Sequence, residues 1–350
     1  MHGTYKVPNG KLVGVDLEVD AGGKLSGVSI SGDFFLEPAQ ALGRLNQALE
    51  GLPATTPPDA LAKRVEGAVL PGDQLIGFGP RDIAIAVRRA LGKATTWADH
   101  TFELIEDGPR EPAMEMALDQ VYAEALASGR RGPTLRFWQW ASSAVVLGSF
   151  QSLSREVDLD AARLYGVTVV RRVSGGGAMF VEPGNTITYS LVVPGSLVDG
   201  LSFQESYRFL DAWTVRALRS LGVRAEYQPI NDIASPQGKI AGAAQKRLAD
   251  GTVLHHVTMA YDIDAEKMVQ VLRIGQEKLA GKGTPSAQKR VDPVRRQTGL
   301  TRDEVVAAFI ERFGSDYRLE RSAPRPGELA KAEDLVKTKF GTREWTARLP

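Results

Sequence analysis

The sequence predicts an α/β protein made of two units, a smaller one followed by a larger one. A chain of 350 residues is long enough for about two domains at roughly 150 residues each. Segments with the two-residue period of strands alternate with segments that have the longer period of helices. The polar, aperiodic stretch 93–101 marks the boundary. We therefore expect one unit over residues 1–92 and another over residues 98–350.

The first unit begins with a predicted β-hairpin. Residues 11–20 and 25–35 each alternate apolar and polar positions, and a glycine-containing turn over 21–24 separates them. Three helical patterns follow, and prolines near their starts suit the first turn of a helix. These helices are expected over residues 38–51, 55–69 and 79–92.

The second unit mixes helices and strands in no simple alternation, which favours a mixed sheet flanked by helices. Helices are expected over residues 112–127, 156–165, 203–221, 264–279, 301–313 and 328–338. Strands are expected over residues 134–140, 144–147, 167–173, 186–193, 224–234, 239–244 and 254–264.

Composition excludes several classes of function. Lys plus Arg is 43 and Asp plus Glu is 42, so the net charge of +1 argues against a protein that coats nucleic acid. The chain has no cysteine, which removes disulfides, thiolate metal sites and thiol nucleophiles. It has four histidines, and one of them is residue 2. No secretory signal and no apolar run of about 20 residues is visible, so we expect a cytoplasmic protein without membrane contact.

The strongest chemical signal is a glycine-rich motif after a predicted strand, Arg171-Arg172-Val173-Ser174-Gly175-Gly176-Gly177-Ala178. Consecutive glycines reach positive φ and let a ligand approach the backbone closely. Successive bare N–H groups can form an anion-binding nest, and arginine pairs well with phosphate or carboxylate. The spacing differs from the P-loop and dinucleotide-binding motifs. The competing interpretation is a glycine turn in a hairpin.

A second signal is a lysine surrounded by small residues on a predicted strand, in Gly238-Lys239-Ile240-Ala241-Gly242. The segment Asn231-Asp232-Ile233 precedes it. Core packing seldom places a lysine among Gly and Ala, so this side chain either points into a pocket or protects an edge strand from aggregation.

The remaining candidates have plainer explanations. Alternation places His255 and His256 on opposite faces of one strand, so they are more simply structural than joint metal ligands. Trp138 and Trp140 share one face and are expected in the core. A basic segment over 281–297 is either solvated or suited to closing over phosphates.

These residues together resemble the lipoate–protein ligase A family. The glycine motif, with Gly184-Asn185 and Tyr189-Ser190 after it, is similar to the family's lipoate-binding loop. The segments around Asp232 and Lys239, through Ala244-Gln245, are similar to its nucleotide and catalytic-lysine segment. The blocks Leu147-Gly148-x-x-Gln151 and Leu272 through Val291 resemble two further family segments.

Residues 1–92 resemble the accessory domain of the same family, which in other members follows the catalytic domain or is a separate chain. A further departure follows the glycine motif, where Phe180-Val181-Glu182 replaces the aromatic residue, His and Asp often found there. The role of that histidine is therefore absent, and substrate specificity is open.

The resemblance implies a mixed α/β catalytic domain of the biotin and lipoate ligase class and a two-step, ATP-dependent reaction. Lipoate or octanoate would be activated to the acyl-adenylate and then transferred to a lysine of a lipoyl domain. Such domains belong to the E2 subunits of 2-oxoacid dehydrogenases and to the glycine cleavage H protein. The implied catalytic residue is Lys239, and Asp232 would bind Mg²⁺ with ATP. The implied substrate- and nucleotide-binding residues are Arg172, Ser174, Gly175, Gly176, Gly177, Ala178, Met179, Phe180, Asn185, Asn231, Asp232, Ala244, Lys289 and Arg290.

Two other function classes stay open. One is an ATP-independent octanoyltransferase that takes octanoyl groups from acyl carrier protein, with Lys239 as general base. Several octanoyltransferases acylate an active-site cysteine, which this chain lacks. The other is a lipoate-binding protein without catalysis, against which the retention of Lys239, Asp232 and the three glycines argues.

Overall fold

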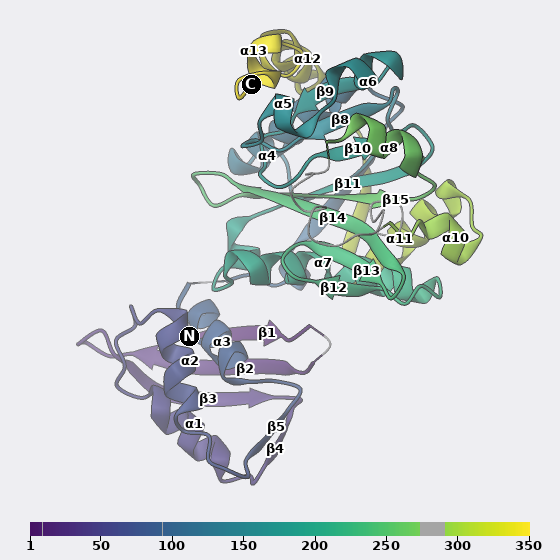
Figure 1. Ribbon diagram of the computed structural model, residues 1–350. Coiled ribbons are helices and arrows are strands. Elements are labelled where there is room, and N and C mark those ends of the chain that lie inside the picture. Colours follow the sequence, from purple (N-terminus) through teal and green to yellow (C-terminus); the bar gives the residue numbers. More distant parts are fainter. Residues whose placement is uncertain (9, 93, 274–290) are drawn as a thin grey trace. The chain divides into compact units, whose positions relative to one another are not determined.

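The computed structural model describes residues 1–8, 10–92, 94–273 and 291–350. The chain divides into two compact units, which are drawn in Figure 1. The first unit contains residues 1–99 and 195–209, and the second contains residues 100–194 and 210–350. Residues 195–209, expected within the second unit, therefore cluster with the N-terminal part of the chain.

The first unit is built on a three-stranded antiparallel sheet in the order β1-β2-β3. The predicted hairpin is present as its second and third strands. The strands of this unit are β1 (His2–Lys6), β2 (Leu12–Val19), β3 (Leu25–Gly32), β4 (Phe35–Glu37) and β5 (Gln74–Ile76). Its helices are α1 (Ala41–Leu49), α2 (Pro58–Glu66), α3 (Pro80–Gly92), η1 (Trp97–Asp99) and η2 (Gly195–Val198).

Helix α3 packs very closely on the first sheet. A Cβ atom added to Gly3 of β1 would lie 2.2 Å from the backbone nitrogen of Ala90, so only glycine fits there. The apolar stripe of α3, including Ile83 and Val87, is buried. Burial of this stripe explains why the predicted helix forms over almost the expected residues.

The second unit contains an eight-stranded mixed sheet in the order β12-β13-β14-β15-β11-β7-β6-β16. A smaller sheet, in the order β10-β8-β9, lies in the same unit. The strands are β6 (Thr101–Glu106), β7 (Thr134–Trp138), β8 (Ala144–Leu147), β9 (Thr168–Arg171), β10 (Met179–Val181), β11 (Thr186–Val193), β12 (Glu226–Gln228), β13 (Asp232–Ser235), β14 (Gly238–Arg247), β15 (Val253–Ala260) and β16 (Arg318–Ser322).

The helices of the second unit cover both faces of the large sheet. They are α4 (Pro112–Ala127), α5 (Leu153–Glu156), α6 (Leu159–Leu164), the part of α7 (Phe203–Ser220) from Leu210 onward, α8 (Ala265–Val271), α10 (Val294–Thr298), α11 (Arg302–Asp316), α12 (Pro326–Leu335), the π-helical turn η4 (Val336–Phe340) and α13 (Arg343–Thr346). None of the helices in the described residues has the length and apolar character needed to cross a membrane.

Strand β11 shows how the two faces differ. Its eight residues are all buried, because helices cover the sheet on both sides. Ser190 donates a hydrogen bond to Asp119 of α4, whereas the next residue back, Tyr189, packs on Trp213 of α7 with ring centroids 4.9 Å apart. The face of the sheet that carries Ser190 and packs on α4 is called the α4 face below.

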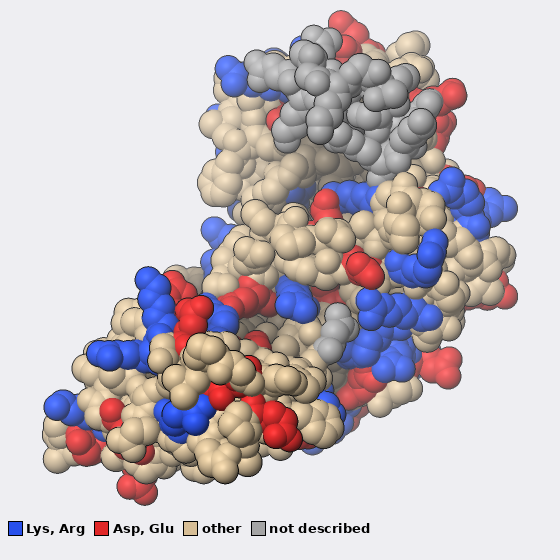
Figure 2. Space-filling view, turned by 60° about the horizontal axis from the view of Figure 1, so that its bottom comes forward, with Lys and Arg blue, Asp and Glu red and all other residues tan. Residues whose placement is uncertain are grey.

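Acidic and basic side chains are interspersed over much of the surface shown in Figure 2, which agrees with the net charge of +1.

Candidate functional site

The glycine-rich loop lies between β9 and β10, and the buried side chain of Arg172 organises it. The guanidinium group donates hydrogen bonds to the carbonyl oxygens of Gly175 (2.6 Å) and Gly177 (2.9 Å). In a trans peptide the C=O and the following N–H point in opposite directions. The N–H groups of Gly176 and Ala178 are therefore directed away from Arg172. Amides directed to one side of a glycine loop in this way are typical of anion-binding nests.

Two glycines make this loop conformation possible. Gly176 has a φ of +92°, which residues with a side chain rarely adopt. A Cβ atom on Gly148 would lie 2.0 Å from the carbonyl oxygen of Gly176, so the two loops touch through bare backbone. The motif Gly148-x-x-Gln151 thus supports the glycine loop, and its Gln151 side chain accepts a 2.8 Å hydrogen bond from the Gly148 amide.

Arg171 and Arg172 hold the two glycine-containing loops through hydrogen bonds to backbone carbonyls. Arg171 is fully buried and donates to the carbonyl oxygens of Gly148 (2.9 Å) and Gln151 (2.7 Å). Burial lowers the pKa of its guanidinium, and the nearby Arg348 lowers it further. Arg172 donates hydrogen bonds to protein carbonyls and to Ser174, and these bonds hold the loop. Its expected place beside a phosphate or carboxylate stays a prediction.

Lys239 and Asp232 form an ion pair on neighbouring strands, with Nζ 2.7 Å from Oδ1. Their side chains remain 48% and 36% exposed, so both can reach a ligand. Strand β14 pairs with β13 and with β15, which rules out the edge-strand explanation for Lys239. A register shift between Ile233 and Ala234 marks a bulge where the two strands meet.

One face of β14 brings the predicted site residues together. Asp232 pairs directly with Gly242, and a Cβ atom on Gly242 would lie 2.9 Å from Lys239 Nζ. Ala244, two residues further along the same face, has its Cβ 3.9 Å from the Cβ position of Gly176. The glycine loop and the lysine pair therefore lie on the same side of the sheet.

Asn231 has a structural part at this place. Its side-chain Nδ2 donates to the Ala243 carbonyl at 2.6 Å, and its own carbonyl accepts from the Ala243 amide at 2.8 Å. These two bonds fix the start of β13 and thereby the position of Asp232.

Two neighbouring residues that were predicted to bind the substrate, Met179 and Phe180, lie in different apolar clusters. Met179 pairs with Val146 and packs in the same apolar cluster, whereas Phe180 packs in a second cluster with Val145 and Leu147. Met179 and Phe180 thus face opposite sides of β10. Lys289 and Arg290 lie outside the described residues, as does the rest of the basic segment up to Arg290.

The positions that depart from the family pattern are also explained locally. Val181 is fully buried in the core cluster beneath α4. Glu182 accepts a hydrogen bond from the Asp264 amide (3.0 Å) and forms an ion pair with Lys267 (2.6 Å). These side chains therefore support structure and do not project into the site.

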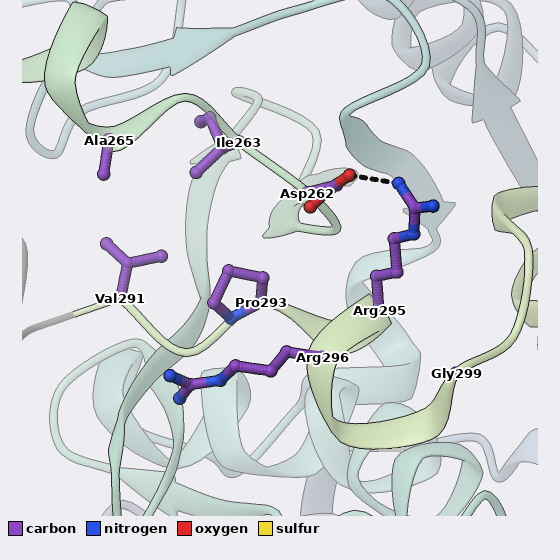
Figure 3. Close-up of a pocket in the computed structure, with 8 residues that line it drawn as sticks. All are labelled: Asp262, Ile263, Ala265, Val291, Pro293, Arg295, Arg296 and Gly299. Carbon is purple, nitrogen blue, oxygen red and sulfur yellow. Dashed lines mark hydrogen bonds and ion pairs between the residues drawn. The ribbon is translucent and has the colours of Figure 1, made fainter.

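A pocket of about 530 Å³ lies beside the lysine strand (Figure 3). Val291, which lines it, pairs with Lys239, and the Asp292 amide donates to the Lys239 carbonyl at 2.8 Å. Figure 3 shows Asp262 turned toward Arg295, with which it forms an ion pair. The Asn185 carbonyl accepts from the Asp262 amide at 3.0 Å, which places Asn185 near the rim.

Sequence reasoning missed a buried polar network behind the glycine loop. Ser174 Oγ lies 2.7 Å from His256 Nε2, and His256 Nδ1 lies 2.8 Å from Asp119 Oδ2. His255 contacts Asp211 of α7 at 2.6 Å, so the expected placement of the two histidines on opposite faces of the strand is confirmed. Trp138 and Trp140 are buried in the core as expected.

The part of the chain that the structure describes could hold a metal only together with groups from a substrate. Among the described residues there is no cluster of three or more His, Asp or Glu side chains suited to a metal ion. Magnesium is commonly held by one or two carboxylates together with substrate phosphates. Asp232 fits that requirement as a single exposed carboxylate beside Lys239.

Residues 111–314 match the family model of the lipoyl protein ligase A/B catalytic domain. An octanoyltransferase LipM from Exiguobacterium sp. is 31% identical over 273 residues, which cover 70% of this chain and 97% of that protein. A structure of a bi-partite lipoate protein ligase from Thermoplasma acidophilum, studied with its E2 lipoyl domain, is 29% identical with a TM-score of 0.63. It matches 72% of this chain and 97% of its own. A lipoate–protein ligase A bound with ATP is 27% identical with a TM-score of 0.62, over 71% of this chain and 100% of its own.

The mixed sheet flanked by helices and the family match together define the second unit as a catalytic domain of the lipoyl protein ligase class. The chain belongs to the lipoyl protein ligase A/B catalytic domain family. The names of its relatives include both transferases and ligases.

Proposed function

We propose that this protein is an ATP-dependent ligase that activates lipoate or octanoate and transfers the acyl group to a lysine of a lipoyl domain. The observation that carries this proposal is the Lys239–Asp232 ion pair beside a glycine nest, in a chain that contains no cysteine. Activation by adenylation needs no protein nucleophile, so the absence of a thiol does not hinder it.

The first step joins two anions, the carboxylate of the acid and the α-phosphate of ATP. The carboxylate oxygen attacks phosphorus, the bond to the bridging oxygen breaks, and pyrophosphate leaves. Lys239 supplies positive charge between the two anions and stabilises the charge that develops on the phosphoryl oxygens. The amides of Gly176 and Ala178 are available to hold the acyl carbonyl or the adenylate oxygens.

In the second step the ε-amine of the acceptor lysine attacks the acyl carbonyl, and AMP leaves. The ammonium group of Lys239 also stabilises the departing AMP oxygen. Asp232 would hold magnesium, which neutralises phosphate charge when it is bound with the nucleotide. The pocket beside Val291 has two arginines at its wall and is our candidate for the nucleotide.

The second candidate is an ATP-independent octanoyltransferase, favoured by the name of the LipM relatives. Without cysteine the acyl group cannot be carried on a thiol, so transfer would be direct, with Lys239 as general base. A ligase needs positive charge between two anions, and the Lys239–Asp232 ion pair offers that charge beside a partly exposed carboxylate that suits magnesium. This pairing is our reason for preferring the ligase.

We also propose a lipoyl domain as acceptor and residues 1–92 as an accessory unit. The Thermoplasma relative is bi-partite and was studied with its E2 lipoyl domain, and a two-part organisation matches the resemblance of the N-terminal residues. The H protein of glycine cleavage is an alternative acceptor of the same chemistry.

One assay tests the proposal. The full chain is incubated with an E2 lipoyl domain and either lipoate, octanoate or octanoyl-acyl carrier protein, with and without ATP and Mg²⁺. Acylation from the free acids that requires ATP, with pyrophosphate release, supports the ligase. Acylation from octanoyl-acyl carrier protein without ATP supports the transferase. Stoichiometric binding of lipoate without turnover supports the non-catalytic alternative.

A further inference from the structure

The hydrogen bonds of the buried network behind the glycine loop have a defined donor and acceptor at each step. At one end, the carboxylate of Asp119 in α4 accepts hydrogen bonds from Arg136 (3.0 Å), Ser190 and His256 (2.8 Å). An ionised carboxylate can only accept. His256 Nδ1 must therefore carry a proton and donate it to Asp119.

The tautomer of His256 then decides what Ser174 can do. With the proton on Nδ1, a neutral His256 has a bare Nε2 that accepts the hydroxyl proton of Ser174 across 2.7 Å. The oxygen of Ser174 is left with lone pairs, and one of them accepts the Nε–H of Arg172 at 3.0 Å. Arg172 in turn holds the carbonyls of Gly175 and Gly177.

We propose that Asp119, His256 and Ser174 form a positioning relay that fixes Arg172 and thereby aims the amides of the glycine loop at the acyl group. This inference rests on the proposed function, because it assigns these residues a part in binding and activating the acid. None of the three touches the reacting atoms in this assignment.

The sheet register supports a built network. Arg136, Ser190, His256 and Ala244 are directly paired across β7, β11, β15 and β14, so they form one row on the α4 face. The row runs from the buried end of the relay to the alanine that borders Gly176. Strand β14, which carries Lys239, thus pairs directly with the strand that carries His256 of the relay.

The protonation states agree with this direction. Burial lowers the pKa of His256 and outweighs its hydrogen bond to Asp119, and Arg172 and His255 lower the pKa further. Burial alone would raise the pKa of Asp119, but the hydrogen bond from His256, the charge of Arg136 and the Ser190 hydroxyl hold it below its usual value. A neutral imidazole between an ionised carboxylate and a hydroxyl is the state that the relay needs.

The constellation resembles a Ser-His-Asp triad in its contacts, yet its position excludes that role. Ser174 is fully buried, and its hydroxyl lies behind the loop with Arg172 against it. A serine nucleophile must reach the carbonyl carbon of its substrate. The relay therefore acts on the loop and not on the acyl carbon.

The test uses Asp119→Asn, which keeps the shape of the side chain but offers an amide N–H to His256. The proton of His256 should then move to Nε2, which donates to Ser174 and reverses the relay. We expect the ¹⁵N spectrum to show His256 as the Nδ1–H tautomer in the wild-type protein and as the Nε2–H tautomer in the variant. The KM for the acid should rise about tenfold or more in ATP-dependent turnover.

Asp211→Asn is the matched control. Asp211 and His255 form an equally buried carboxylate–imidazole pair at 2.6 Å, but on the opposite face of the sheet from the glycine loop. We expect Asp211→Asn to leave the KM for the acid near the wild-type value. Ser174→Ala serves as a second variant if Asp119→Asn folds poorly, and it should raise the same KM in the folded protein.

Three results would overturn the relay. These are an unchanged KM in a folded Asp119→Asn or Ser174→Ala variant, an Nε2–H tautomer in the wild-type protein, and equal losses in the Asp119 and Asp211 variants. Absence of ATP-dependent turnover in the wild-type protein would contradict the proposed function instead, and the tautomer measurement would still decide the direction of the hydrogen bonds.

Discussion

Lys239 shows how much the neighbours of a single residue in the sequence reveal about its role. Its Gly and Ala neighbours predicted either a lysine that points into a pocket or a lysine that protects an edge strand. Strand β14 lies inside the sheet, which excludes the second explanation. We expect Lys239→Ala to reduce acid-dependent pyrophosphate release by about 10²-fold or more, because a key electrostatic contact to the transition state is lost. Lys246→Ala, an exposed lysine on the same strand, should release pyrophosphate at the wild-type rate. A folded Lys239→Ala variant with near-normal release would exclude this role.

Gly242 is a sensitive position for the same pair. A Cβ atom there would lie 2.9 Å from Lys239 Nζ and 3.5 Å from Asp232 Oδ1, so Gly242→Ala should push the flexible lysine end away. We expect a loss of at least tenfold in kcat/KM with little change in melting temperature. Gly43→Ala, which has no neighbour within 4 Å of its Cβ position in α1, should be fully active and slightly more stable. An active Gly242→Ala enzyme would show that the pair tolerates displacement.

His256 predicts a pH dependence with a definite sign. Its pKa in the folded protein lies below the ordinary value of 6.5. At pH values between the folded and the unfolded pKa, the unfolded chain therefore binds more protons than the folded one. Stability is therefore fully present above pH 6.5 and is lost as the pH falls. Protonation also removes the acceptor of the Ser174 hydroxyl. We expect kcat/KM to be flat above pH 6.5 and to fall at lower pH, and His256→Gln to show a lower value without that acid limb. An unchanged acid limb in His256→Gln would assign the titration to another group.

The residues proposed to contact a ligand could be predicted from the sequence far better than the residues that lie behind them. The glycine loop is a contiguous motif, and Asp232 and Lys239 are seven positions apart. The relay joins residues separated by 82 and 137 positions. No local pattern marks such a pairing, since its partners meet only when β15 and α4 pack on the loop. Arg172 illustrates the same limit, because its charge did not reveal its hydrogen bonds to the carbonyls of Gly175 and Gly177.

At the scale of elements, strongly patterned segments were predictable and weakly patterned ones were not. The helix over 112–127 has the bounds of α4, because its apolar residues face the core through all its turns. Strand β16 (Arg318–Ser322) was not expected, since it is an exposed edge strand with mostly charged residues and carries no alternation. Strand β6 (Thr101–Glu106) is an inner, partly buried strand that was also not expected, because it directly follows the polar linker.

The C-terminal segment 343–350 is an element that supports the site from a distance. The carbonyl of Thr346 accepts two hydrogen bonds from the buried Arg171, at 2.8 and 3.0 Å. Arg348 donates to Ser149, next to Gly148. Removal of residues 343–350 leaves Arg171 with unpaired donors, and unsatisfied buried groups cost about 1–3 kcal/mol each. We expect a lower melting temperature together with a raised KM for the acid.

Arg343→Ala is the control for this deletion, because Arg343 is exposed in the same segment. It should match the wild-type protein in both measurements. If the deletion lowered the melting temperature but left the KM unchanged, the segment would stabilise the fold without shaping the acid site.

The two units of the molecule are not two continuous stretches of the sequence. Residues 195–209 belong to the first unit, although they come between β11 and the later part of α7. Arg89 donates to the carbonyl of Leu197 at 3.0 Å, and Arg81 forms an ion pair with Glu205 at 2.7 Å. Trp97 stacks on Phe209 with ring centroids 5.4 Å apart. These contacts show that the segment is folded against residues 1–99.

A fragment of residues 98–350 therefore retains the segment 195–209 but loses its partners Arg81 and Arg89. The freed carboxylate of Glu205 is tolerable in water, whereas the apolar side chains of Leu197, Val198 and Leu201 would gain exposure wherever residues 1–97 cover them. We expect the fragment to bind an apolar dye more strongly, to melt at a lower temperature and to form little acyl-adenylate. Supplying residues 1–95 as a separate chain should reverse all three changes, because the missing contacts are non-covalent. If the fragment formed acyl-adenylate at the full-length rate, the N-terminal unit would be dispensable for activation, and its place would lie in recognition of the acceptor domain.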